Sequence, residues 1–171
     1  AIQKGTTSNV PVEQEITQND VSRVLELAKA VSLPVDREIL HILPQEYLID
    51  TMDSIKDPVG MSGRRLEAKV HLITMAATTA KNLVNCVHEM AIDVEGLVFQ
   101  ALASAIATLD TDEKELGVAV VDIGAGTTDI TVFYDGGVRH SAVISVGAST
   151  VTNDIAVMLQ IGMEDAEQIK L

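Results

Sequence analysis

The sequence contains few aromatic residues and a single cysteine. Trp is absent, and two Phe and two Tyr are the only aromatic side chains in 171 residues, which argues against platforms that stack on bases or sugars. One cysteine, Cys86, excludes an internal disulfide, does not indicate a zinc site and suits a reducing, cytosolic setting. We expect Cys86 to be an inert thiol packed on a helix.

Basic residues and long apolar runs are also scarce. Lys and Arg number 12 against 25 Asp and Glu, which gives a formal net charge of −13. A surface this acidic repels phosphate backbones and anionic lipids, so we expect no nucleic-acid partner. The longest apolar candidate, residues 96–109, is shorter than the roughly 18 to 20 residues needed to span a bilayer. Hydrophobic residues still make up 47% of the chain, enough for a packed core.

Residues 1–75 predict a compact α+β unit. Mixed β-branched and turn residues favour edge strands around a turn over residues 1–16. Thr17 and Asp20 form a capping signal before an apolar i, i+3, i+4, i+7 pattern, which predicts an amphipathic helix over residues 18–32. Beyond this helix we expect strands over 37–43 and 47–50 around Pro44, a loop over 51–65, and a strand with one solvated face over 66–75.

The rest of the chain predicts helices that precede and follow a strand meander. We expect helices over 78–90 and 100–109, a short strand over 93–99 between them, and a polar link over 110–115 as a candidate hinge. Three antiparallel strands over 117–122, 127–134 and 138–146 and a helix over 150–160 follow. The chain lacks an initiating Met and ends at Leu171 within a predicted helix, so we expect it to be a fragment of a longer protein.

The segment that carries chemistry is residues 120–130, Val-Val-Asp-Ile-Gly-Ala-Gly-Thr-Thr-Asp-Ile. An apolar strand ends there at Asp122, which can hold Mg²⁺ through water. Glycines at alternating positions of the following turn let backbone N–H groups approach a phosphate, and two threonines add hydroxyl donors. Because the glycines lie between two strands, the segment is neither a P-loop nor a dinucleotide fingerprint. The candidate phosphate ligands are Gly124, Ala125, Gly126, Thr127 and Thr128.

Several of these features have an alternative interpretation. An ordinary tight hairpin with Asp122 as a turn acid would have the same glycine spacing. Asp129 either supports the phosphate loop from behind or lies on the solvated face of a strand. The basic cluster at residues 64–69 is either a solvated face or a docking patch for an acidic partner. The four histidines, His41, His71, His88 and His140, are expected to be ordinary surface or core residues.

Particular strings of the sequence resemble a known family. The string Asp-x-Gly-x-Gly-Thr-Thr-Asp at 122–129 resembles the second phosphate loop of the actin, Hsp70 and sugar-kinase superfamily. More specific are Pro-Gln-Glu-Tyr at 44–47 and Asp-Pro-Val-Gly-Met-Ser-Gly at 57–63. Together with residues 39–50, 55–64, 66–74, 115–129 and 165–170, these strings resemble the FtsA family of bacterial cell-division proteins.

This resemblance implies a fold class and a division into subdomains. The class is α/β, with α+β character in the N-terminal part, and the fold is actin-like (ribonuclease H-like) with an FtsA-type 1C subdomain. Residues 1–75 correspond to the 1C assembly and interaction subdomain. Residues 76–114 correspond to the second part of subdomain 1A, and residues 115–171 to the start of subdomain 2A with its phosphate loop.

The resemblance also implies a function. Family members bind ATP and Mg²⁺, polymerise through 1C, link FtsZ filaments to the membrane at the septum and recruit later division proteins, with weak or no ATPase activity expected. The implied location is cytoplasmic, peripheral on the inner face of the cell membrane at the division site. The first phosphate loop, the adenosine-binding segment, the FtsZ-binding subdomain and the C-terminal amphipathic membrane helix are expected outside this chain, which should alone hold half of the nucleotide site.

The resemblance also implies roles for single residues that match the family's motifs. Asp122 is expected to hold Mg²⁺ through water, residues 124–128 to bind the β- and γ-phosphates, and Gln100 to orient the attacking water. Gln100 has an alternative role as a simple polar residue at a helix N-terminus. Two further functions stay open: a pure interaction module with an idle nucleotide loop, and a small-molecule kinase of the same superfamily.

Overall fold

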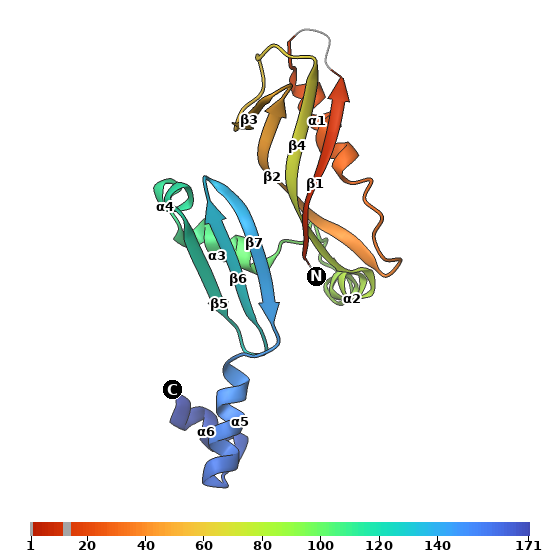
Figure 1. The fold of residues 1–171 in the computed structure, drawn as a ribbon. Helices are drawn as coiled ribbons and strands as arrows, with labels where there is room; N and C mark the ends of the chain where they lie inside the picture. Colours follow the sequence, from red (N-terminus) through yellow and green to blue (C-terminus); the bar gives the residue numbers. More distant parts are fainter. Residues whose placement is uncertain (1, 12–14) are drawn as a thin grey trace.

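The computed structural model describes residues 2–11 and 15–171 and consists of two sheet-containing units followed by a helix pair (Figure 1). The part of the sequence expected to form edge strands, residues 1–16, is described only in part: residues 2–11 form a strand, and 1 and 12–14 lie outside the described residues. No helix in the described ranges is long and apolar enough to cross a membrane.

The first unit is a four-stranded antiparallel sheet with one helix against it. Its strand order is β1-β4-β2-β3, and α1 packs against β1 and β4. The elements are β1 (Ile2–Pro11), α1 (Gln18–Ala28), β2 (Arg37–Ile49), β3 (Met52–Ile55) and β4 (Arg65–Ala76). The predicted α+β character of this part is therefore observed.

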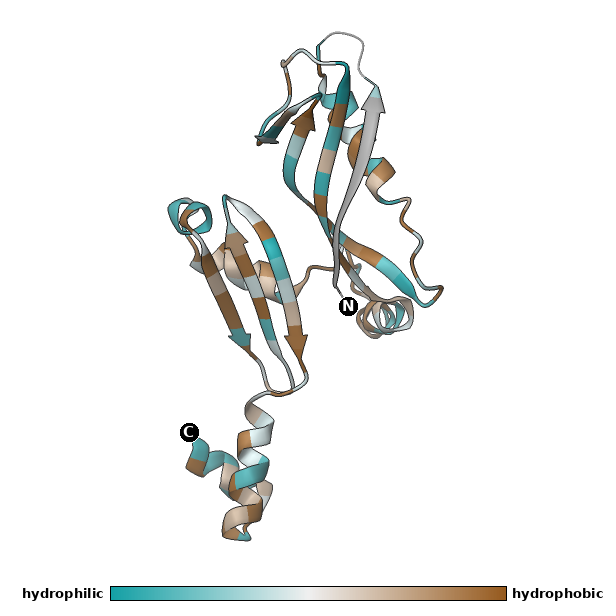
Figure 2. Ribbon diagram, viewed as in Figure 1, coloured by the Kyte–Doolittle hydropathy of each residue, from teal (hydrophilic) through white to brown (hydrophobic). Residues whose placement is uncertain are grey.

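Period-two alternation builds the core of the first unit. Leu66, Ala68, Val70 and Leu72 of β4 are fully buried and form one cluster with Val24 of α1. Figure 2 shows the corresponding alternation of hydrophobic and hydrophilic residues along β4. The strand presents one side chain in two to the helix. The expected solvated face is observed only as far as Lys69, because residues 70–74 are buried on both faces of the strand.

Helix α1 begins where the capping signal predicts and ends early. The Thr17 N–H donates to Asp20 Oδ2 at 3.0 Å, and the Asp20 N–H donates to Thr17 Oγ1 at 3.4 Å. The helix ends at Ala28 rather than near Ser32. Its last backbone bonds are of the shorter i→i+3 kind, from Lys29 to Glu26 and from Ala30 to Leu27, so the chain leaves the helix well before Pro34.

The strand and loop expectations need two corrections in this unit. Pro44 does not separate two strands, because β2 is continuous and absorbs the proline at a register shift between Pro44 and Glu46. Bulges are where a sheet tolerates proline. The expected loop over 51–65 also contains the short strand β3, which pairs with β2 through a turn at Asp50. Asp50 adopts φ 52° and accepts hydrogen bonds from the N–H groups of Arg64 and Arg65.

The second unit is a three-stranded antiparallel meander with a helix on one face. It contains α3 (Gln100–Thr108), α4 (Thr111–Leu116), β5 (Val118–Ile123), β6 (Thr128–Tyr134) and β7 (Gly137–Ile144) in the sheet order β5-β6-β7. Helix α3 packs against β5 and β6. Asp135 and Gly136 both have positive φ, the geometry of a two-residue hairpin turn between twisted strands.

Three helices complete the chain. Helix α2 (Ala77–His88) follows β4, and α5 (Ala148–Leu159) with α6 (Met163–Lys170) forms a pair that projects from the end of the second sheet (Figure 1). Cys86 on α2 is exposed, so the expectation of a packed thiol is wrong. Ala80 is the one buried residue of this helix, and Cys86 lies well beyond it.

Two further expectations between α2 and β5 are wrong. Residues 93–99 form no strand and pair with neither sheet, and propensity alone does not make a strand. The polar link over 110–115 is largely helix α4. The Asp110 N–H donates to Glu113 Oε2 at 2.9 Å, so an Asp-x-x-Glu capping signal in the sequence marked this helix.

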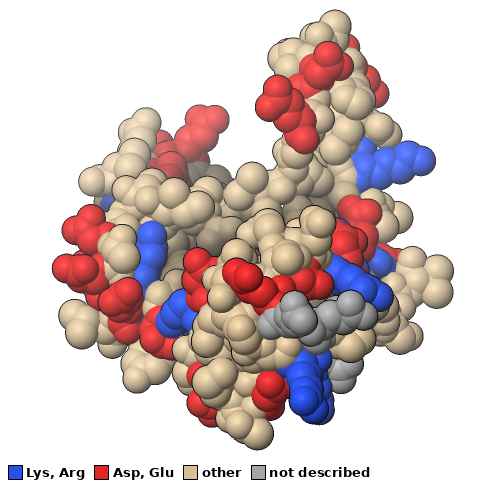
Figure 3. Space-filling model, turned by 90° about the horizontal axis from the view of Figure 1, so that it is seen from above, with Lys and Arg blue, Asp and Glu red and all other residues tan. Residues whose placement is uncertain are grey.

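Two members of the basic cluster at 64–69 form ion pairs with glutamates of the first unit. Arg65 forms an ion pair with Glu67, and Lys69 lies 3.0 Å from Glu46 across the sheet. Figure 3 shows acidic side chains spread over the visible face with fewer basic ones among them. The basic cluster at 64–69 is therefore largely compensated by glutamates, which favours the solvated-face interpretation.

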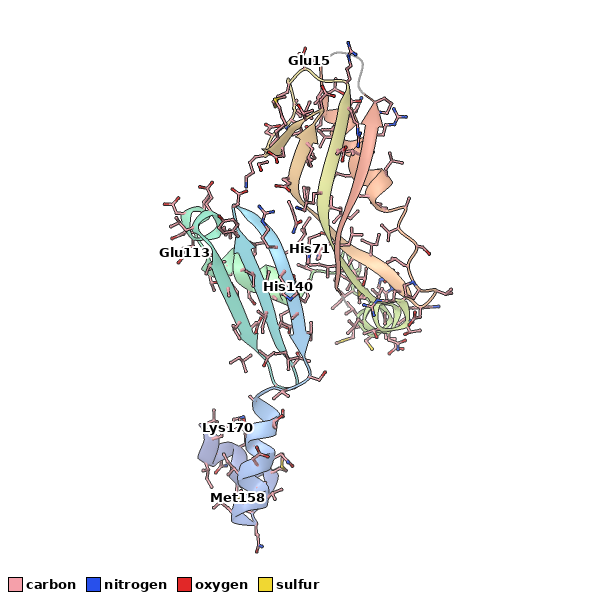
Figure 4. The ribbon with its side chains drawn as sticks, viewed as in Figure 1. Glu15, His71, Glu113, His140, Met158 and Lys170 are labelled. Carbon is pink, nitrogen blue, oxygen red and sulfur yellow. The ribbon has the colours of Figure 1, made fainter. Side chains whose placement is uncertain are left out.

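The two units meet along β7, which lies against β2 and β4. We call this contact the seam: Leu43, Gln45 and His71 of the first sheet against Val138 and Ser141 of β7. Gln45 Nε2 donates to the Val138 carbonyl at 2.6 Å, and His71 Nε2 lies 3.1 Å from Ser141 Oγ. His71 and Ser141 are 2% and 1% exposed, and Figure 4 shows His71 between the first sheet and β7. Leu43 packs against Val138 and its cluster.

A second histidine ties the seam to the segment before α3. The Phe99 N–H donates to His41 Nε2 at 3.0 Å, so this nitrogen must be unprotonated. Burial lowers the pKa of His41, and burial together with the nearby His140 lowers the pKa of His71. Both rings therefore favour the neutral form within the folded chain.

These two histidines predict a loss of stability between pH 7.5 and pH 5.5. In the folded chain the pKa of each ring lies below the usual histidine value of 6.5, so the unfolded chain binds protons first as the pH falls. The free energy of unfolding therefore decreases as the pH falls through 6.5, and it goes on decreasing until the pH is below the lower pKa of the folded chain. The melting temperature measured across this window should decrease with acidification.

In His71→Gln the decrease in melting temperature should be smaller, whereas His88→Gln, at an exposed position on α2, should match the wild type. An unchanged pH dependence in His71→Gln would contradict the assignment.

Candidate functional site

The glycine-rich segment forms a tight hairpin between β5 and β6. The Gly124 N–H donates to the Thr127 carbonyl at 2.8 Å, which leaves Ala125 and Gly126 at the exposed tip. Alternation along β5 places Asp122 on the same side of the sheet as Val118 and Val120, the side that packs with α3. The strand thus delivers its acid to the turn, as the sequence pattern predicts, and the structure also directs it toward the helix.

Helix α3 supplies two hydrogen bonds to Asp122. Gln100 Nε2 donates to Asp122 Oδ2 at 3.1 Å, and Ser104 Oγ donates to the same oxygen at 2.6 Å. The structure therefore brings together Gln100 and Asp122, two candidate residues 22 positions apart in sequence. Ser104 was not among the sequence candidates. Its signal was its i, i+4 spacing from Gln100, which places both side chains on one face of a helix.

The two glycines have different reasons to lack a Cβ. A Cβ at Gly124 would lie 3.2 Å from the Thr127 carbonyl oxygen, so the turn itself requires a small residue there. A Cβ at Gly126 would meet nothing within 4 Å. The space in front of Gly126 is therefore open, and a glycine there keeps the backbone accessible to a ligand. This openness leaves room for a phosphate group at the hairpin tip.

The hairpin carbonyls are turned toward α5. The Ala148 and Ser149 N–H groups donate to the carbonyls of Gly124 and Ala125 at 2.9 and 2.8 Å. In a trans peptide the carbonyl and the next N–H point in opposite directions, and no peptide bond here is cis. The N–H groups of Ala125 and Gly126 therefore point away from α5, side by side. Consecutive N–H groups with one direction form an anion-binding concavity.

The threonine hydroxyls are used within the protein. Thr128 Oγ1 donates to the Val146 carbonyl at 2.7 Å, and Thr127 Oγ1 donates weakly to Asp129 Oδ2 at 3.4 Å. Thr128 thus lies at the hairpin with its hydroxyl proton committed elsewhere, whereas the exposed Thr127 is tied by a bond near the limit of hydrogen-bond distance. Of the two predicted hydroxyl donors, Thr127 is the better placed.

Asp129 lies directly opposite Asp122 in the β5–β6 ladder, on the same face of the sheet. It is only 6% exposed, so the solvated-face interpretation of Asp129 is wrong. Like charges at directly opposed positions destabilise a sheet, and a cation near this pair would relieve the repulsion. Within the described ranges no group of three or more His, Cys, Asp or Glu could hold a metal. One or two carboxylates with retained waters fit Mg²⁺ better than a metal that needs a full protein cage.

The fold places this site in a recognised class. The chain resembles one from the PilM-PilN type IV pilus biogenesis complex with a TM-score of 0.60 and 14% identity, over 99% of this chain and 47% of that chain. With its mixed helices and antiparallel sheets, this likeness confirms the predicted actin-like fold class.

Sequence comparison then gives the family. Residues 2–74 match the family model "SHS2 domain inserted in FTSA", and residues 119–171 match "Cell division protein FtsA". Proteins named "Cell division protein FtsA" from Pseudomonas aeruginosa and Escherichia coli K12 are 46% and 48% identical over 93% and 95% of this chain. One from Borreliella burgdorferi is 45% identical over 92%. The chain belongs to the FtsA family. It spans 38 to 39% of the length of these relatives.

The contact between the hairpin and α5 predicts that Gly147 is intolerant of substitution. A Cβ at Gly147 would lie 2.5 Å from the Ala125 carbonyl oxygen and 2.6 Å from that of Gly124, both backbone atoms. Gly147→Ala should therefore push the hairpin from α5, at a cost of about 1–3 kcal/mol, and speed amide hydrogen exchange at Ala148 and Ser149. In the control Gly162→Ala, the new Cβ would be 3.7 Å from a side-chain oxygen, an ordinary contact. Equal exchange in both variants would refute the tight approach.

Proposed function

We propose that the protein is an actin-like, ATP-binding protein of bacterial cell division, and that this chain contributes the Mg²⁺ and phosphate side of its nucleotide site. The observation that carries the proposal is the Asp122 carboxylate, held by Gln100 and Ser104 beside a glycine hairpin whose tip is open. Family membership supports the cell-division role. The named relatives favour it over a small-molecule kinase.

The residues of the hairpin would act mainly by binding and orientation. The N–H groups of Ala125 and Gly126 would donate to phosphate oxygens, with Gly124 keeping the turn tight and Thr127 and Thr128 flanking it. Asp122 Oδ1, the oxygen that takes neither bond from α3, would accept from a water on Mg²⁺. The metal held there would supply positive charge beside the β- and γ-phosphates. Gln100, which donates to Asp122, would be the residue that orients an attacking water, and we expect slow hydrolysis or none.

The two units would serve different tasks within the complete protein. We assign residues 1–75 to the 1C assembly and interaction subdomain, 76–114 to the second part of subdomain 1A, and 115–171 to the start of subdomain 2A. The family-model matches over 2–74 and 119–171 support the first and last of these boundaries. The first unit also has a hydrophobic core of its own, as a module that contacts other proteins requires.

The proposed partners follow from this division of tasks. Self-association and contacts with later division proteins would use the 1C unit. FtsZ and the membrane would be bound through other parts of a family-length protein. The protein would then act in the cytoplasm, peripheral on the inner face of the cell membrane at the division site, with nucleotide setting its conformation and assembly.

Replacement of Asp122 tests the proposal. In the full-length protein, Asp122→Ala should weaken Mg-ATP binding about tenfold or more in calorimetry, because removal of a hydrogen-bonded metal partner typically costs 10- to 100-fold. Asp154→Ala, which removes an exposed carboxylate on α5, should bind like the wild type. A folded wild type that binds no Mg-ATP would instead make the glycine hairpin a structural turn. The first unit would then be the functional surface.

A further inference from the structure

Ser104 contacts Asp122 but was not among the residues predicted from the sequence to bind phosphate or Mg²⁺. We propose that Ser104 is a positioning residue, which holds the Asp122 carboxylate in the orientation that a Mg²⁺-bound water needs. The inference rests on the proposed function, since it concerns the metal side of the same site. It assigns to Ser104 a role distinct from that of Gln100, although both side chains reach the same oxygen.

The geometry of the two bonds separates the roles. Ser104 Oγ lies 2.6 Å from Asp122 Oδ2, the short distance of a hydrogen bond to a charged acceptor, whereas Gln100 Nε2 lies at 3.1 Å. Ser104 is half-buried and Gln100 is exposed. One side-chain torsion angle sets the position of the serine Oγ, whereas three torsion angles set the position of the glutamine Nε2. Ser104 can therefore hold Asp122 at little cost in conformational entropy, and Gln100 cannot.

The position of Ser104 is itself fixed by packing. Its neighbours Ala101 and Ala105 on α3 are fully buried, and Ala105 belongs to the cluster formed with Phe133 and Val138. Rotation of α3 would expose these alanines, so the helix face that carries Ser104 stays directed toward β5. The hydroxyl thus has a rigid support, which loops and exposed side chains do not provide.

Fixing Oδ2 determines what the other oxygen can do. The two oxygens of a carboxylate diverge, so a bond from α3 to Oδ2 leaves Oδ1 directed away from Ser104. The buried Asp129 lies across the ladder, and its repulsion would tend to turn an untethered Asp122 side chain outward. Ser104 opposes that rotation. With Asp122 held in this way, Gln100 is free to leave it and contact a water or phosphate.

The test measures the Mg²⁺ requirement of ATP binding in the full-length protein. A fluorescent ATP analogue at fixed concentration is titrated with Mg²⁺, and its affinity is measured again in EDTA. Ser104→Ala should raise the Mg²⁺ concentration for half-maximal binding about tenfold and leave the affinity in EDTA unchanged. Ser104→Thr, which keeps the hydroxyl, should restore the wild-type Mg²⁺ requirement. Alanine is the best helix former, so α3 should persist, which circular dichroism checks.

Thr108 provides a matched control on the same helix. Its hydroxyl donates to the Ser104 carbonyl within α3 and does not contact Asp122. Thr108→Ala removes a hydroxyl one turn away and should leave the Mg²⁺ requirement at the wild-type value.

Each other outcome overturns the inference in a distinguishable way. A wild-type Mg²⁺ requirement in Ser104→Ala, with Asp122→Ala still defective, would refute the role of Ser104 and leave the proposed function standing. An equal loss of affinity with Mg²⁺ and in EDTA, not restored by Ser104→Thr, would show a merely structural residue. Absence of Mg-ATP binding by the wild type would refute the proposed function and this inference together.

Discussion

The close approach of α3 to the β5–β6 sheet is the constraint on which the candidate site depends. Ala101 and Ala105 are small enough to bring the helix backbone against the strands, and both are fully buried there. That packing places Gln100 and Ser104 beside Asp122, so the three polar side chains meet although they come from separate elements. A larger side chain at either alanine would lift the helix and break both hydrogen bonds to the carboxylate. The polar chemistry of the site is thus set by apolar contacts.

Strand β7 connects this site to the first unit. Near its start, Val138 and Ser141 contact Gln45 and His71 across the seam. Just beyond its end, Gly147 packs on the carbonyls of the glycine hairpin. The segment from β7 to the start of α5 therefore contacts both the unit proposed to mediate assembly and the loop proposed to hold phosphate. A nucleotide-dependent change in that loop would have a short, packed path to the seam.

Local sequence patterns predicted most helices and strands. Features that depend on contacts between distant parts of the chain could not be predicted in this way. Alternation in β4 and the Thr17 cap were readable because each depends on residues close in sequence. Residues 93–99 carry strand-forming residues without a partner strand, which no local pattern reveals. Asp110 and Glu113 form a capping box that could have been recognised in the sequence, and it begins α4 where only a polar link was expected. Asp122 and the hairpin were predicted, whereas Ser104 needed the helix docked on the sheet before its role could be seen.

A crystal structure of the full-length protein with Mg²⁺ and a non-hydrolysable ATP analogue would show directly whether the glycine hairpin and Asp122 together bind the phosphates and Mg²⁺ of ATP. We expect phosphate oxygens within hydrogen-bond distance of the Ala125 and Gly126 N–H groups, and a Mg²⁺-bound water on Asp122 Oδ1. Phosphates bound away from this hairpin, with Asp122 contacting only Gln100 and Ser104, would contradict this expectation.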